Sequence, residues 1–353
     1  MNEEQRTNFI EQIKNHAYLI LKQHYHLSVS ARVSVIFDRE TELSQMLKEG
    51  FESAIQKHAN SYDLHDYATF DHQEYFDDLD WNAREGDIAI LIQSTSFRST
   101  KFRFRNDLCT RGLKVIEFGH LHKVLEEEYQ TFIDSLKPDD ERIFPLVDSL
   151  VEELKDITSI EITSLNGSVI KYSGPMDFAT TNDGRYEGQT NYGSRYPIGE
   201  VISEGLDLST LNGDIEVYAY PSIEGQLTQF VDPFIVTIEN GFVVSHNGPE
   251  EFNDLIELIK TEHPEGKVYV REFGLGLNRG IPRHSRIGDP IAYERQEGLH
   301  FSLGMKHGIY QKKLWPKYGK KFKQKFHIDV YVNVKSMKFN EKEVYTYPKG
   351  FVL

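Results

Sequence analysis

The sequence predicts a mixed fold, with an N-terminal open α/β sheet domain followed by a β-rich α+β domain. The first 155 residues alternate between helical spacing and short apolar runs, which is typical of a sheet covered by helices. From residue 157 onward, strand-like runs follow one another with turn residues between them. A chain of 353 residues is long enough for two domains that each bury a core. We therefore expect domains at residues 1–155 and 156–353.

Helices and apolar strands alternate through the first domain. Apolar residues at helical spacing predict a helix over 9–21, and Thr41 can cap a second helix. A third helix is expected near 126–136. Strand-length apolar runs lie at 33–37, 88–92 and 113–118. Such continuous runs are typical of buried parallel strands. The first strand is not followed by a glycine-rich phosphate-binding pattern, so a nucleotide-binding fold is not predicted.

The second domain follows a bridging helix that we expect at 143–154. Strand-like runs lie at 160–162, 169–172, 215–220, 234–238 and 242–245. Asn-Gly and Asp-Gly pairs separate several of these runs, as expected for an antiparallel sheet. One further helix is predicted at 250–262.

Composition limits the classes of partner. The net charge of −15 argues against nucleic-acid binding. No apolar run approaches the roughly 18 residues of a membrane span. The single cysteine, Cys109, excludes an internal disulfide and a thiolate zinc site. The polar N-terminus does not read as a secretory signal, so we expect a cytoplasmic protein.

Acids and histidines in the second domain are the candidates for chemistry. They lie beside glycines or within strand-like runs, and all are carboxylate or imidazole donors: Glu200, Glu272, His300, His307, His327 and Asp329. His327 and Asp329 are two residues apart in a strand-like run, so both should project from one face. Carboxylates that bridge and imidazoles that cap are what a two-metal hydrolytic site needs.

The segments that carry these residues resemble, in order, those of the aminopeptidase T / aminopeptidase S family of dinuclear metallopeptidases. The run 197–201 is similar to the family's Pro-x-Gly-Glu-Val, and 272–278 is similar to Glu-Leu-Gly-Ile-Gly-x-Asn. The run 298–304 resembles Gly-Thr-x-His-x-Ala-x-Gly, and 326–329 resembles the terminal His-x-Asp pair. The resemblance extends from Asp183 to the C-terminus.

The resemblance implies two divalent ions, zinc, cobalt or manganese, that share Glu272. It implies a homodimer and a bridging water that attacks an N-terminal peptide bond, with Glu200 or Glu272 moving the proton. The other implied metal ligands are Glu200, His300, His327 and Asp329. The chain departs from the family at His307, where the family has a tyrosine, and at Tyr196, where it has an asparagine.

Other residues are weaker candidates. Arg271 and Arg185 could bind a substrate carboxylate in a forked pair, with surface salt bridges as the alternative. Tyr310 could replace the missing tyrosine after a short loop shift. Glu294 and Glu297 could orient an imidazole of the site, with solvated loop acids as the alternative.

Three functions remain open at this stage. The leading hypothesis is a metal-dependent hydrolase of aminopeptidase type that acts on a peptide or small-molecule substrate. One alternative is a mononuclear Fe(II) ring-cleaving dioxygenase of dihydroxypyridine type, because two histidines and one carboxylate suit iron and oxygen chemistry. The other is a non-catalytic or biosynthetic-partner protein that kept the scaffold, which the departures at His307 and Tyr196 would favour.

Overall fold

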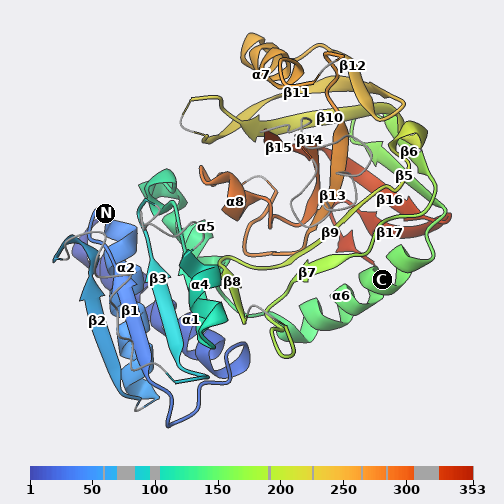
Figure 1. Ribbon diagram of the computed structural model, residues 1–353. Helices are drawn as coiled ribbons and strands as arrows, with labels where there is room; N and C mark the ends of the chain where they lie inside the picture. The colour runs from blue at the N-terminus through green and yellow to red at the C-terminus, as the bar shows by residue number, and fades with distance from the viewer. Residues whose placement is uncertain are drawn as a thin grey trace. The chain divides into compact units, whose positions relative to one another are not determined.

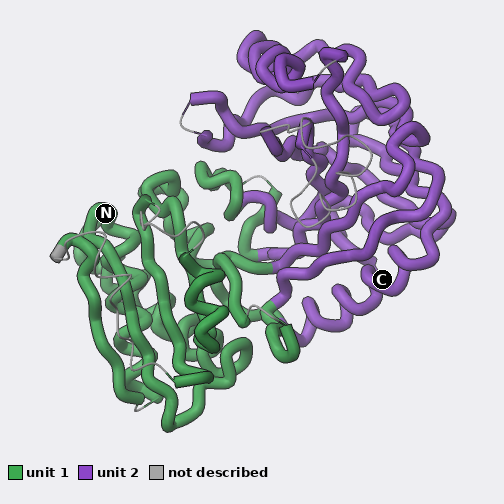
Figure 2. Tube along the Cα trace, viewed as in Figure 1, with its two compact units in different colours: residues 1–139, 184–198, 280–292 green, residues 140–183, 199–279, 293–353 purple. Residues whose placement is uncertain are grey.

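A computed structural model describes residues 1–58, 60–69, 84–95, 104–189, 192–224, 226–263, 265–283, 285–305 and 326–352. The chain forms two compact units (Figure 2). Unit 1 contains residues 1–139, 184–198 and 280–292, and unit 2 contains residues 140–183, 199–279 and 293–353. We expected one boundary near residue 155, whereas in the structure the segments of the two units interleave along the chain.

Unit 1 is built on a parallel sheet of order β2-β1-β3-β4-β8 (Figure 1). Its strands are β1 (Val33–Phe37), β2 (Tyr62–Asp66), β3 (Ile88–Ile92), β4 (Lys114–Phe118) and β8 (Gly193–Arg195). Its helices are α1 (Glu3–Gln23), α2 (Glu42–Lys57), α4 (Phe104–Thr110) and α5 (Tyr129–Asp134). The predicted strands β1, β3 and β4 are confirmed, and so is the cap of α2, where the Thr41 hydroxyl accepts from the Ser44 N–H.

Two strands of unit 1 were not predicted. Strand β2 lies in an acidic stretch, and its residues are half-buried or exposed, so it lacks an apolar pattern. Strand β8 comes from the middle of the chain and is only three residues long. The helix expected at 126–136 is split into a 3₁₀ turn (Glu126–Glu128) and α5.

Unit 2 contains an antiparallel sheet of thirteen strands among the described residues, in the order β18-β17-β16-β5-β6-β10-β15-β14-β13-β9-β7, with β11 paired to β10 and β12 paired to β11. The first strands are β5 (Ser159–Ser164), β6 (Val169–Ser173), β7 (Thr180–Asn182), β9 (Glu200–Glu204), β10 (Asn212–Pro221), β11 (Thr228–Glu239) and β12 (Phe242–His246). The others are β13 (Val270–Gly276), β14 (Gly298–Gly304), β15 (His327–Val332), β16 (Val334–Phe339), β17 (Lys342–Thr346) and β18 (Gly350–Phe351). Helices α6 (Asp140–Lys155) and α7 (Glu250–Lys260) confirm the two helices predicted here. A short helix, α8 (Pro290–Tyr293), lies where the chain passes from unit 1 back to unit 2.

The middle of this sheet has two different faces. Every residue of β9, β13 and β14 is buried. On β14, Leu299, Phe301 and Leu303 belong to the apolar core of the unit. The intervening His300 and Ser302 project to the opposite face because side chains alternate along a strand. The polar side chains of β14 therefore project from the face of the sheet opposite the apolar core.

None of the described helices is long and apolar enough to cross a membrane.

Candidate metal centre

Five of the six predicted ligands lie on four strands that neighbour one another in the sheet, β9-β13-β14-β15. Each of the first three strands contributes one residue and β15 contributes two: Glu200, Glu272, His300, His327 and Asp329. The sixth, His307, and the substrate candidate Tyr310 lie outside the described residues.

The register of the strands brings these side chains to one place. Gly274 of β13 pairs with His300 of β14, and Ser302 of β14 pairs with Asp329 of β15. Gly276 of β13 pairs with Glu200 of β9. Cross-strand partners lie within about 5.5 Å of each other, so residues far apart in sequence become neighbours on one face. The pairing of β13 with β14 shifts between residues 270 and 273, around the position of Glu272.

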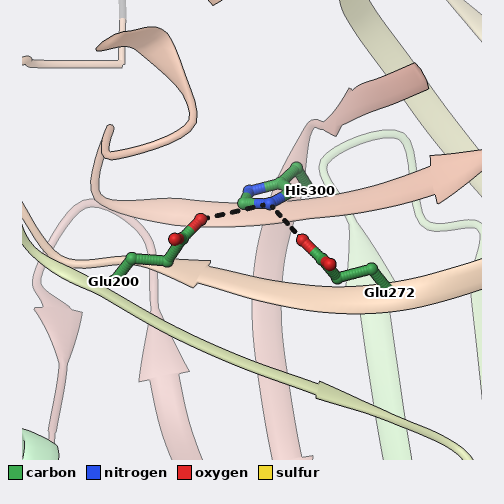
Figure 3. Close-up of side chains that lie close together, drawn as sticks. All are labelled: Glu200, Glu272 and His300. Carbon is green, nitrogen blue, oxygen red and sulfur yellow. Dashed lines mark ion pairs between the residues drawn. The ribbon is translucent and has the colours of Figure 1, made fainter. Parts of the chain in front are cut away.

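The ligand atoms form two groups that share Glu272. His300 Nε2 lies 3.5 Å from a Glu200 oxygen and 3.6 Å from Glu272 Oε1 (Figure 3). His327 Nε2 lies 3.3 Å from Asp329 Oδ1 and 3.8 Å from Glu272 Oε2. Within each group the ligand atoms lie within 4.8 Å of one another. We call the first group the Glu200 half and the second the Asp329 half.

The burial of these residues, and the lack of well-formed hydrogen bonds to several of their polar atoms in the described part of the chain, are consistent with a bound cation. Glu272 and His300 are 4% and 1% exposed, and Asp329 is 9% exposed. Three of their atoms are buried without a well-formed hydrogen bond among the described residues, namely Glu272 Oε2, His300 Nε2 and Asp329 Oδ1. Since buried polar atoms are nearly always satisfied, such a cluster needs an explanation, and a metal ion coordinated by these atoms would provide one.

The pKa values follow from this crowding. Burial lowers the pKa of His300, but Glu272, Asp329 and Glu200 outweigh burial and raise that pKa to about 9. Burial also lowers the pKa of the half-buried His327, yet Asp329 and Glu272 raise that pKa to about 10. Burial raises the pKa of Glu200. Without a metal, protons on the two imidazoles therefore neutralise part of the carboxylate charge.

Neighbouring groups orient the ligands. His327 Nδ1 lies 3.1 Å from the Met305 carbonyl, which leaves Nε2 facing Asp329 and Glu272. The Glu272 N–H donates to the Ser302 hydroxyl at 3.0 Å. Gly274 leaves the space that the His300 ring occupies, because a Cβ there would lie only 2.0 Å from His300 Nε2.

Arg295 is a member of the cluster that the sequence analysis did not identify. Its Nη1 lies 2.6 Å from Glu200 Oε2 and 2.6 Å from Glu294 Oε1, and its side chain is 7% exposed. Burial raises the pKa of Glu294 well above its ordinary value. Nothing in the local pattern distinguishes Arg295 from an arginine of a solvated loop. Its proximity to His300 in sequence was the one available signal.

The other predicted residues lie elsewhere. Arg271 is 5% exposed, and its side chain donates to the Gly304 carbonyl and pairs with Glu204 within unit 2. Arg185 lies in a segment of unit 1. Glu297 pairs with Arg279 and Arg142 instead of orienting an imidazole.

Tyr196, the departure from the family's asparagine, is buried within unit 1. Its hydroxyl lies 2.8 Å from His24 Nδ1. The contact with His24 gives the Tyr196 hydroxyl a partner within unit 1.

Comparison with solved structures finds the same overall fold in two enzymes. The chain is similar to 2,5-dihydroxypyridine dioxygenase from Pseudomonas putida KT2440, with a TM-score of 0.59, 14% identity and 96% of each chain covered. It is also similar to AmpT, the aminopeptidase T of Thermus thermophilus, with a TM-score of 0.57, 11% identity and 96% of each chain covered. No family model matches the sequence, and no curated protein matches it.

At these identities the likeness establishes a shared fold and a distant structural relation to aminopeptidase T. The two neighbours carry different activities on that fold, so the function must be argued from the site itself.

Proposed function

We propose that the chain is a metal-dependent hydrolase of aminopeptidase type. The observation that carries the proposal is the pair of ligand groups, one buried and one partly buried, that share Glu272 on four neighbouring strands. The donors are carboxylate oxygens and imidazole nitrogens, which suit zinc, cobalt or manganese. The structural likeness to aminopeptidase T supports this class.

The residues divide the work as follows. Glu272, His327 and Asp329 would hold a divalent ion, with His300 facing it from β14. When bound, such an ion lowers the pKa of a water molecule and polarises a substrate carbonyl. Glu200 or Glu272 would accept the proton from the attacking water, since both carboxylates lie within the cluster. The substrate would be a peptide or a small amide with a free N-terminus.

A second candidate is an Fe(II) ring-cleaving dioxygenase. Two imidazoles and one carboxylate, from His300, His327 and Asp329, form the ligand set typical of mononuclear iron oxygenases. The structural likeness to 2,5-dihydroxypyridine dioxygenase supports testing this reaction beside peptide hydrolysis.

Metal content and paired assays test the proposal. The protein would be incubated with zinc, cobalt or manganese, desalted, and analysed for metal per chain by mass spectrometry. A panel of aminoacyl anilides would then be assayed, with the Glu272→Gln variant as control. Retained metal with cleavage that Glu272→Gln abolishes supports the hydrolase. Oxygen uptake on 2,5-dihydroxypyridine after ferrous reconstitution, without anilide cleavage, would replace it with the dioxygenase.

The homodimer also remains a proposal. Light scattering coupled to size-exclusion chromatography would give the mass in solution, and the mass of a single chain at working concentration would contradict the homodimer.

A further inference from the structure

A buried guanidinium lies among the carboxylates of the candidate metal centre. Arg295 is 6% exposed and shares one nitrogen, Nη1, between Glu200 and Glu294 at 2.6 Å each. The contact with Glu294 is a charged hydrogen bond and the contact with Glu200 is an ion pair, and a guanidinium keeps its charge in proteins. The Glu200 half therefore already contains a positive charge, which the Arg295 side chain provides.

The backbone fixes this cation in place. The Arg295 carbonyl accepts from the Asn278 N–H at 2.8 Å, just after β13. Gly276 allows this approach, because a Cβ there would lie 1.9 Å from the Gln296 carbonyl oxygen. The Leu277 N–H donates to the Gly199 carbonyl at 2.9 Å, next to Glu200. The segments that carry Arg295 and Glu200 are thus both joined to the same end of β13.

The two halves of the centre differ in charge. In the Asp329 half, the carboxylates of Glu272 and Asp329 face His327, a neutral ligand once it loses its proton. In the Glu200 half, one Glu200 oxygen already binds Arg295. A divalent ion on the other oxygen would lie close to the guanidinium in a buried site, where little solvent screens their repulsion.

We infer that Arg295 takes the place of a second divalent ion, so that the centre binds one ion through Glu272, His327 and Asp329. Glu200 then stays uncoordinated. Arg295 acts as a positioning residue that holds the Glu200 carboxylate near the ion, where it can accept a proton. This inference rests on the proposed metal-dependent function and specifies the stoichiometry and the base.

The experiment counts metal. Full-length protein is stripped with a chelator, incubated with excess zinc or manganese, desalted, and analysed for ions per chain. We expect about one ion in the wild type, about one in Arg295→Lys, which keeps the charge, and about two in Arg295→Gln. Arg279→Gln is the matched control, because that arginine pairs with Glu297 outside the cluster and its side chain is 49% exposed.

A second variant covers the case in which Arg295→Gln does not fold, as judged by circular dichroism. Glu200→Gln should bind the single ion with an affinity within roughly 10-fold of the wild type, the lower range of the cost for changing a residue outside the ligand set. Two ions in the wild type would overturn the inference and leave the proposed function standing. No ion in the wild type would overturn both. A single ion in folded Arg295→Gln, or a loss of affinity far beyond 10-fold in Glu200→Gln, would overturn the inference alone.

Discussion

Buried carboxylates occur in both units, but in opposite states of satisfaction. In unit 1, Asp38 is 4% exposed and accepts from the Ser94 N–H, the Ser94 hydroxyl and the Glu40 N–H. In unit 2, Glu272 is also 4% exposed, yet its Oε2 has no well-formed hydrogen bond among the described residues. The two carboxylates are thus equally buried but differ in their hydrogen bonds.

The difference separates a structural acid from a ligand. A buried carboxylate with two or three hydrogen bonds holds its surroundings together, and little is left for another partner. A cluster of buried acids and imidazoles with unsatisfied atoms instead destabilises the metal-free fold until a cation arrives. Substitutions in the two places should therefore have separable effects on stability and on metal binding.

The largest expected effect is at Glu272. Glu272→Gln removes the carboxylate shared by both halves, so metal affinity should fall by more than the roughly 100-fold cost of losing an outer partner. Turnover should fall to background with it. The metal-free variant should also be less stable than the wild type, because Glu272 lies 3.6 Å from His300 Nε2 and 3.8 Å from His327 Nε2 and offsets the charge of both imidazoles. Calorimetric metal titration and denaturant unfolding measure metal affinity and stability, and retained affinity would contradict the assignment of Glu272 as a metal ligand.

A subtler change tests the fit of the imidazole. In Gly274→Ala the added Cβ would overlap His300 Nε2, so the ring must move and metal affinity should fall by about 10- to 100-fold. Gly205→Ala is a matched control, because its Cβ would meet the Tyr172 ring instead, and it should lower stability without changing metal affinity. Equal metal affinities in the two variants would show that the position of the His300 ring does not affect the bound ion.

The sequence predicted the Asp329 half better than the Glu200 half. His327 and Asp329 are two residues apart on one strand, so alternation alone places them on one face, and the structure puts them 3.3 Å apart. Bringing Glu200, Glu272 and His300 together depends on the register of three strands that are distant in sequence, which local spacing cannot supply. Only the ordered resemblance pointed to it.

The same distinction applies to the fold. Strands β1 and β3 are continuous apolar runs, and their bounds were predicted to the residue. Strand β8 has three residues and joins the sheet through pairing with β4, so long-range contact rather than composition makes it a strand. Arg295 was missed for a similar reason, since its burial depends on backbone contacts with the end of β13.

On the structural side of the comparison, Asp38→Ala should lower the free energy of unfolding by about 2 kcal/mol, because it leaves the buried Ser94 N–H without an acceptor. Metal content should be unchanged. Ser94→Ala removes the hydroxyl that donates to Asp38 and contacts the Thr41 hydroxyl, and should cost about 1 kcal/mol. Urea unfolding of both variants measures these changes. A drop in metal content for Asp38→Ala would contradict the view that Asp38 serves stability alone.

A pH-dependent effect is expected at a half-buried base in unit 1, His120. Burial, together with Arg195, Lys123 and His122, lowers the pKa of His120 to about 3, against an ordinary value of 6.5. Between these two values the unfolded chain binds a proton that the folded chain does not, so this group makes stability fall as the pH falls from 6.5 towards 3. In His120→Asn, a residue that tolerates the left-handed backbone at this position (φ 59°), that contribution disappears. The difference in unfolding free energy between variant and wild type should therefore move in favour of the variant on acidification, by no more than about 1.4 kcal/mol per pH unit. A difference that stays constant between pH 6.5 and 4 would mean that the imidazole titrates alike in both states, and that the polar groups of unit 1 do not keep His120 neutral.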